Sequence, residues 1–205
     1  PKKDAVPVSE MLELDRWALA RVDALQDRIL ELEQTYQFHL VTSLLMSFAT
    51  EDLGGFYLDV LKDRLYTTKA DGLPRRSAQT TLWHITATLL RLMAPILSFT
   101  AEEAFAVFSP NESGTIFTET NHMVPEVANA PELLAKWEAV RSARAKVLKE
   151  IETLRAEGKI GSSLAADAVI TASGSDWQYL ASLGEELRFV MMTSKCELRK
   201  AEKDD

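Results

Sequence analysis

Apolar residues recur at intervals of three and four along most of this chain, and this periodicity restricts the fold more than any other feature of the sequence. Between Met11 and Leu32 the spacing places seven apolar side chains on one face of a single long helix, with Ser9 as its expected cap and its end near Tyr36. A second stripe predicts another long helix, which Pro131 opens and Gly158 ends. Stripes of this kind have to be buried against other helices, so the sequence predicts a mainly α fold.

Most of the first 108 residues continue the helical pattern. A helix is expected from Phe38 to a break at Gly54-Gly55, another from there to a turn near residue 71, and a third from Arg75 to Pro95. Thr100 and Glu103 have the spacing of a capping box for one more helix. Four or five helices joined by short loops predict an antiparallel helical bundle.

The sequence changes character after Gly158. Two short segments, "AVITA" and "KCELRKA", have the composition of strands and flank a helical stretch that is interrupted at Gly184. We therefore expect three parts: a helical bundle over residues 1–130, a long connecting helix over 131–158, and a small α/β appendage over 159–205.

The charge distribution narrows the range of partners. A net charge of −8 argues against an indiscriminate nucleic-acid binder. Residues 62–76 nevertheless hold five basic and two acidic residues, and residues 141–159 hold six basic and three acidic ones. These two basic segments indicate either a specific anionic partner or simply two solvated helix faces, and charge alone favours neither interpretation.

Neither a catalytic site nor a metal site can be identified in the sequence. The three histidines are scattered, and His84, between apolar neighbours on a helix, is expected to be a packed and hydrogen-bonded core residue. A single cysteine, Cys196, excludes an internal disulfide and a multi-cysteine metal site. The chain also has no run of about 18 uncharged apolar residues and no signal-peptide pattern, so we expect no membrane span and a cytoplasmic location.

Arg64 interrupts an otherwise regular pattern. On a helical wheel it lies inside an apolar arc that includes Tyr57 and Val60. Unpaired burial of a guanidinium is very costly, so Arg64 should either pair with a buried carboxylate, such as Asp15 or Glu51, or emerge in a groove that holds a ligand. We expect the structural ion pair.

Several segments together resemble a known family. In order, they are "LDRWALARVDAL", "FYLDVLKDRLYTTKAD", "RRSAQTTLWHI", "LLRLMAPILSFTAEEAF", "GSSLAADAVI" and "GEELRFVMMTS". Nearly the whole chain resembles the C-terminal, anticodon-binding part of bacterial isoleucyl-tRNA synthetases, which are class I enzymes. The valyl, leucyl and methionyl relatives share looser forms of some segments, and the last segment favours the isoleucyl family over its valyl relative.

The resemblance implies a function that the spacing of residues does not show. It implies that the bundle binds the anticodon stem-loop of isoleucine tRNA, as a monomer, and that ATP, Mg²⁺ and zinc serve the full-length enzyme without binding here. The HIGH and KMSKS motifs of the catalytic domain are absent, so this chain alone is expected to be inactive. The family's opening bundle helix and its cysteine-rich zinc module are expected outside these residues.

Basic and aromatic side chains are the candidates for contact with RNA. We expect the phosphate backbone to be bound near the turn that follows residue 67, and two further basic residues to extend this track. Trp17, beside Arg16, is a candidate for stacking on a base. The predicted RNA-binding residues are Arg16, Trp17, Lys62, Lys69, Arg75, Arg76, Arg144 and Lys159. A helical protein-interaction module without an RNA partner is the alternative from another functional class.

Overall fold

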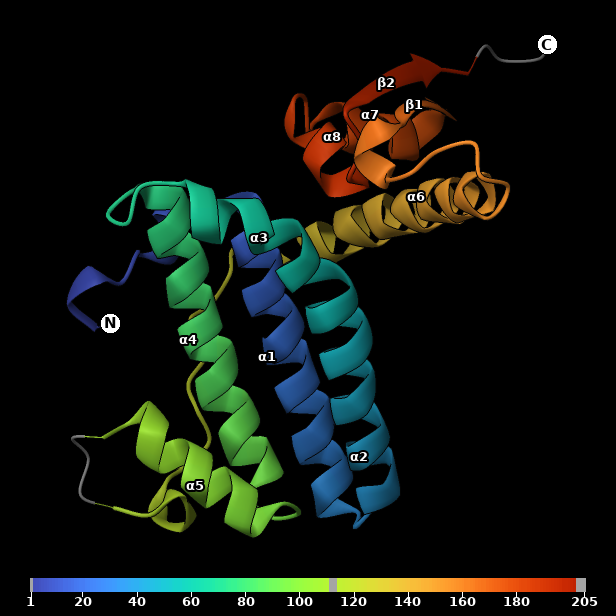
Figure 1. Cartoon of the computed structure of the whole chain (residues 1–205). Helices are drawn as coiled ribbons and strands as arrows, with labels where there is room; N and C mark the ends of the chain where they lie inside the picture. Colours follow the sequence, from blue (N-terminus) through green and yellow to red (C-terminus); the bar gives the residue numbers. More distant parts are fainter. Residues whose placement is uncertain (1, 111–113, 202–205) are drawn as a thin grey trace. The chain divides into compact units, whose positions relative to one another are not determined.

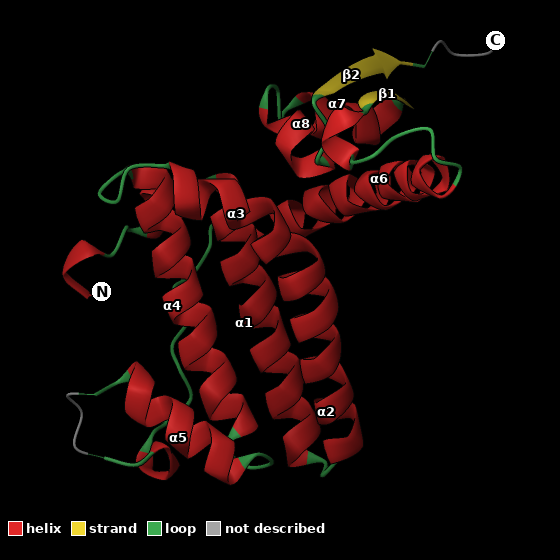
Figure 2. Cartoon of the chain, in the orientation of Figure 1, coloured by secondary structure: helices red, strands yellow, loops and turns green. Residues whose placement is uncertain are grey.

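The computed structural model describes residues 2–110 and 114–201, which form two compact units. The first unit extends to Ala130 and the second begins at Pro131. Helices dominate both units, and the strands are confined to the second (Figures 1 and 2). The fold is mainly α, as the apolar periodicity predicts.

The first unit is a helical bundle with short connections (Figure 1). Short 3₁₀ turns at Lys2–Asp4 and Val8–Glu10 precede it, and a further one follows at Ile116–Thr118. Its α-helices are α1 (Glu13–Gln34), α2 (Phe38–Ser47), α3 (Leu58–Thr67), α4 (Leu73–Met93) and α5 (Ser98–Phe108).

Helix α1 is the central element of this unit. It packs against α2 on one side and α4 on the other (Figure 1). A helix that is covered from two sides buries a wider arc than the single stripe that its periodicity predicts. Trp17, Leu19 and Ala20, which lie outside the predicted stripe, are buried for this reason.

The expected break at Gly54-Gly55 does not occur. Residues Phe48–Tyr57 form a π-helix that joins α2 to α3 without interruption. Here the backbone passes close to the preceding turn, because a Cβ at Gly55 would lie 3.0 Å from the Thr50 carbonyl oxygen. The two glycines therefore permit a wider helical winding instead of ending the helix.

Neighbouring helices of the bundle are not all antiparallel. Helices α1 and α2 run in opposite directions, as predicted, whereas α1 and α4 run in the same direction (Figure 1). Their first turns are joined by a hydrogen bond of 3.1 Å from the Leu12 amide to the Ser77 hydroxyl. The reason is that α2, the π-helix and α3 together return the chain to the end at which α1 begins.

Two predicted helix caps do not form. Ser9 lies in a 3₁₀ turn, and α1 starts instead at Glu13. Thr100 lies inside α5, which starts at Ser98, and the neighbouring Glu102 accepts a hydrogen bond of 2.8 Å from the Ile116 amide. Glu102 thus has a partner remote in sequence, which a local cap pattern does not reveal.

The second unit combines a long helix with a small α/β element. Helix α6 (Ala130–Ala156) ends before Gly158, which has a φ of +71°. Strands β1 (Asp167–Ala172) and β2 (Lys195–Lys200) pair in parallel, with Asp167 opposite Lys195. Helices α7 (Gly174–Ala181) and α8 (Glu186–Met191) connect the strands, as parallel pairing requires.

Candidate nucleic-acid interface

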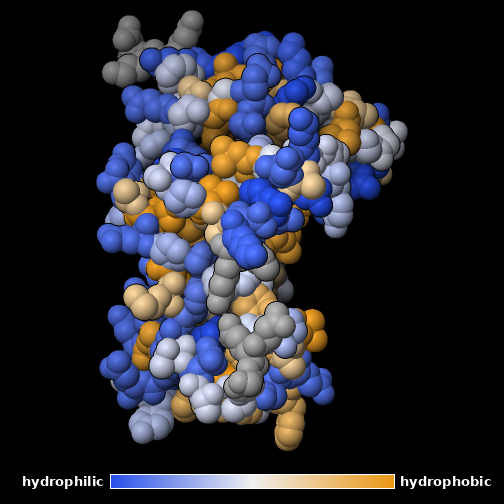
Figure 3. All heavy atoms as spheres, turned by 90° about the vertical axis from the view of Figure 1, so that its left-hand side faces the viewer, coloured by the Kyte–Doolittle hydropathy of each residue, from blue (hydrophilic) through white to orange (hydrophobic). Residues whose placement is uncertain are grey.

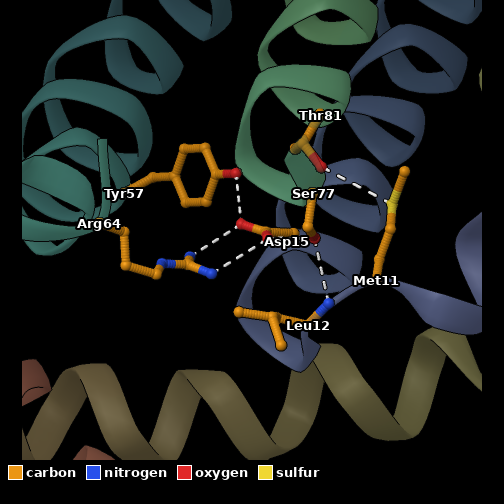
Figure 4. Close-up of polar contacts among 7 residues, drawn as sticks. All are labelled: Met11, Leu12, Asp15, Tyr57, Arg64, Ser77 and Thr81. Carbon is orange, nitrogen blue, oxygen red and sulfur yellow. Dashed lines mark hydrogen bonds and ion pairs between the residues drawn. The ribbon is translucent and has the colours of Figure 1, made fainter. Parts of the chain in front are cut away.

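A buried carboxylate fixes the helices that carry the first basic segment. Asp15, on α1, is completely buried, and Figure 4 shows donors converging on it from three directions. Arg64 donates from Nη2 to Oδ1 at 2.9 Å and from Nη1 to Oδ2 at 3.1 Å. The guanidinium is thus paired with a buried carboxylate, one of the two arrangements that the sequence left open.

Two hydroxyl groups complete the coordination of this carboxylate. Tyr57 donates to Oδ1 at 2.7 Å and Ser77 donates to Oδ2 at 2.5 Å (Figure 4). Burial, followed by the negative charge of Asp15, raises the pKa of Tyr57 well above its usual value, so the phenol stays protonated as a donor. Asp15 therefore holds the first turns of α1 and α4 and the middle of α3 together.

The basic residues of the first segment are distributed over α3, the turn that follows it and the start of α4. Lys62 is 67% exposed and lies 3.1 Å from Asp59 on the same helix. Lys69 is exposed in the turn between α3 and α4. Arg75 is half-buried, and its Nη1 lies 3.5 Å from the Thr68 carbonyl oxygen. Lys69 and Arg75 thus lie at the C-terminal end of α3, and Lys62 lies in the middle of that helix.

Arg76 lies further along α4, at the edge of a groove. Its Nη1 is 3.4 Å from a carboxylate oxygen of Asp4. The groove, of about 650 Å³, is lined by the first residues of the chain and by one face of α4, including Leu82 and Trp83. Figure 3, which views the side of the N-terminal segment and α4, shows hydrophobic atoms interspersed with hydrophilic ones. Because of its contact with Asp4, the charge of Arg76 is partly neutralised.

Two predicted contact residues are buried, so these predictions are corrected. Trp17 is 2% exposed, and its ring packs edge-on against Phe56 at 5.0 Å between ring centroids, which leaves no face for a base. Arg144, on α6, is also buried, and it donates to the Val190 carbonyl at 2.8 Å and to the Met192 sulfur at 3.0 Å. It stabilises the second unit and does not face a phosphate.

Arg16 and Lys159 are the remaining predicted residues. Arg16 is half-buried on α1, and its Nε is buried without a hydrogen-bond partner in the described part of the chain. Lys159 is 64% exposed and lies 2.7 Å from Glu157. Lys159 is accessible to an anion, whereas Arg16 offers only part of its guanidinium.

An exposed aromatic residue was missed by the sequence analysis. Tyr66, in the last turn of α3, is 82% exposed and follows Lys62 by one helical turn. The signal was present in the sequence, because an aromatic four residues after a lysine shares its helix face. The sequence-based candidates include Trp17 and not Tyr66 as the stacking residue.

His84 is packed and hydrogen-bonded, in line with its sequence-based interpretation. Its Nδ1 lies 2.8 Å from Nε2 of His122, and both rings contact Trp83 edge-on. Burial lowers the pKa of His84. Burial, His84 and Arg91 together lower the pKa of His122 from its ordinary 6.5 to about 4. This pair fastens the segment around residue 122 to α4.

The residues that the structure describes contain neither a group of metal ligands nor a membrane span. No three His, Cys, Asp or Glu side chains lie together there as metal ligands would. The zinc that the family resemblance implies thus has no fitting site among residues 2–110 and 114–201. No helix in these ranges is long and apolar enough to cross a membrane.

Comparison with curated proteins gives relatives along nearly the whole chain. The isoleucine--tRNA ligase of Janthinobacterium sp. (strain Marseille) is 54% identical over 196 residues, which are 94% of this chain and 20% of that protein. The isoleucine--tRNA ligase of Paraburkholderia phymatum is 54% identical over 203 residues, or 99% of this chain and 21% of that protein. That of Aromatoleum aromaticum is 48% identical over 200 residues, or 98% of this chain and 21% of that protein.

The chain therefore spans about a fifth of the length of these relatives. A family model described as the anticodon-binding domain of tRNA ligase matches residues 15–170, which include the Asp15 cluster, the basic end of α3 and all of α6. The chain belongs to the family of anticodon-binding domains of tRNA ligases.

Proposed function

We propose that this chain is the tRNA-binding part of an isoleucine--tRNA ligase and that it holds the anticodon stem-loop of isoleucine tRNA. Apart from family membership, one structural observation supports the proposal. Lys69 and Arg75 lie at the C-terminal end of α3, whose orientation is fixed by the Asp15–Arg64 pair, and Lys62 is exposed in the middle of that helix. A rigid, positively charged helix end is suited to a defined position on an RNA backbone.

The physical requirements of RNA binding agree with this arrangement. Contacts of lysine and arginine with phosphates position the RNA and make its affinity dependent on salt. A chain with a net charge of −8 has no general attraction for nucleic acid, so its positive charge must be local to be effective. Lys69 supplies exposed charge of this kind, and Lys62 supplies it beside its partner Asp59.

The ligase reaction belongs to this proposal at the level of the longer protein. The relatives are named as isoleucine--tRNA ligases, and we infer that a longer protein containing this chain attaches isoleucine to its tRNA, with ATP and Mg²⁺. The chain would contribute tRNA binding and none of the reacting groups. A cytoplasmic location and a monomeric state stay predictions, and so does the choice of isoleucine over valine.

A binding titration with paired lysine variants tests the proposal. The probe is an RNA stem-loop with an isoleucine anticodon, titrated against the whole 205-residue chain at several salt concentrations. Replacing Lys62 and Lys69 together by Ala should weaken binding and reduce the slope of log affinity against log salt by about two, roughly one for each lost phosphate contact.

A matched pair on the second unit serves as the control. Lys195 and Lys200, on β2, are also exposed, and their replacement by Ala removes the same total charge. This control pair should keep the wild-type salt slope. If both double variants lose the same affinity for the stem-loop, the loss is due to net charge and not to a contact at Lys62 and Lys69. If the wild-type chain shows no saturable binding, the proposed function is rejected.

A further inference from the structure

Tyr66 is a large aromatic side chain that the fold leaves almost entirely uncovered. It is 82% exposed, and its ring meets no other aromatic ring in the part of the chain that the structure describes. Single exposed apolar residues are ordinary on protein surfaces, so exposure alone assigns no role. Its surroundings distinguish it.

Two lysines lie near Tyr66 in the chain, and Arg75 lies near the same helix end. Lys62 precedes Tyr66 by one helical turn on the same face of α3, and Lys69 follows three residues later in the exposed turn. The Arg75 guanidinium lies 3.5 Å from the Thr68 carbonyl oxygen, which places it near the C-terminal end of α3. Tyr66 therefore lies within the basic segment 62–76, which holds five basic and two acidic residues.

A second exposed tyrosine shows the contrast. Tyr36, after the end of α1, is 81% exposed, and residues 31–40 around it hold two glutamates and no lysine or arginine. Its ring also meets the ring of Phe38 at 6.2 Å. Tyr66 and Tyr36 are thus equally exposed, but only Tyr66 lies in a basic segment.

The Asp15–Arg64 pair fixes the direction in which Tyr66 points. Residues two apart on an α-helix are about 200° apart around its axis. Since Arg64 is directed inward to the buried Asp15, Tyr66 is directed away from the bundle core. A ring held by a rigid helix loses little conformational freedom when a planar ligand stacks on it.

We propose that Tyr66 is a stacking platform for an unpaired base of the bound RNA, next to phosphates that Lys62, Lys69 and Arg75 contact. This inference rests on the proposed function and adds the mode of base contact to it. Unpaired loop bases are available for stacking on aromatic side chains, whereas paired bases of a stem are not. Every base has a π-face, so this contact supplies affinity for a loop without selecting its sequence.

Three substitutions of Tyr66 and two RNAs test the inference. The whole chain and its Y66A, Y66F and Y66W variants are titrated with the anticodon stem-loop and with the same stem as a blunt duplex without a loop. Y66A should weaken stem-loop binding about 5- to 150-fold, the range for loss of one stacked base. The salt slope should not change, because no phosphate contact is lost. Y66F and Y66W should bind the stem-loop nearly as well as wild type, and all four proteins should bind the duplex equally.

Tyr36→Ala is the matched control, since it removes an equally exposed tyrosine outside the basic segment, and it should leave both affinities unchanged. If the wild-type chain binds neither RNA, the proposed function fails and the stacking role fails with it. If the wild type binds the stem-loop and Y66A binds it as tightly, only the stacking role is rejected. A loss in Y66F as large as in Y66A would also reject it, because the hydroxyl and not the ring would then be responsible.

Discussion

Arg64 and Asp15 form a bidentate ion pair in which both carboxylate oxygens accept a hydrogen bond from the guanidinium, at 2.9 and 3.1 Å. Each oxygen accepts one further hydrogen bond, from Tyr57 or from Ser77. A carboxylate has room for about four such donors, so the hydrogen-bonding capacity of Asp15 is filled. The charged residue that interrupts the apolar arc of α3 is therefore the residue that fastens α3 to α1.

Removing the guanidinium should destabilise the bundle strongly. Arg64→Met leaves Asp15 buried with two hydroxyl donors and no compensating charge, and we expect a loss of about 3–5 kcal/mol in the free energy of unfolding. Urea denaturation followed by circular dichroism measures it. Lys62→Met, which breaks only the exposed pair with Asp59, is the control and should cost less than about 1 kcal/mol.

Removing both charges should be less costly than the separate losses added together. Asp15→Asn combined with Arg64→Met takes away the uncompensated charge that makes the single Arg64 variant unstable. A double-mutant cycle by urea denaturation should give an interaction energy of about 1–3 kcal/mol. Strict additivity of the two losses would contradict the assignment of the pair.

Trp17 should affect stability and not base recognition. Its ring is buried against Phe56, so Trp17→Ala should cost about 3–5 kcal/mol in the free energy of unfolding through the cavity that it leaves. Trp17→Phe, which retains most of the packing, should fold and bind the anticodon stem-loop with wild-type affinity. A selective loss of stem-loop affinity in a fully folded Trp17→Phe protein would restore Trp17 as a stacking candidate.

Arg144 should likewise act on the stability of the second unit. Arg144→Met leaves the Val190 carbonyl without its charged donor, at an expected cost of about 1–3 kcal/mol in the free energy of unfolding. The salt slope of RNA binding should stay unchanged. Arg155→Met is the control on the same helix, because Arg155 is 48% exposed and its pair with Glu152 is a surface contact that contributes little.

The sequence predicts the helices well because their apolar spacing is set by burial along each helix. It also indicates that Arg64 has a buried partner, since a guanidinium in an apolar arc requires one. The identity of that partner depends on which helix lies opposite. From the sequence alone, Asp15 and Glu51 are equally good candidates. Only the tertiary arrangement selects Asp15.

The wrong sequence predictions share a physical cause. A local pattern carries no information about which residues pack against it in the folded chain. Periodicity gives the position of the apolar stripe on α1 but not its width, and a second covering helix widened it to include Trp17. A basic segment gives charge but not direction, and Arg144 is the member of its segment that turns inward to Val190. Gly54 and Gly55 have the composition of a helix break and yet allow a π-helix.

The contact between His84 and His122 should make stability depend on pH. Only one proton can lie between the two nitrogens at 2.8 Å, so the contact requires at least one neutral ring. Burial, His84 and the nearby Arg91 hold the pKa of His122 at about 4 in the folded state, below the ordinary 6.5 of an unfolded chain. The unfolded chain therefore binds more protons between these two values, and this contribution to stability is lost as the pH falls through that range.

The urea midpoint should accordingly decrease from about pH 7 to about pH 5, with a weaker dependence once the pH is below the folded-state pKa of His122. His122→Gln removes the titrating group and should give a shallower decrease over the same range. His39→Gln removes an exposed histidine of α2 and should retain the wild-type dependence. If His122→Gln and the wild type lose stability in parallel, the pH dependence arises from other groups, and the histidine pair contributes packing alone.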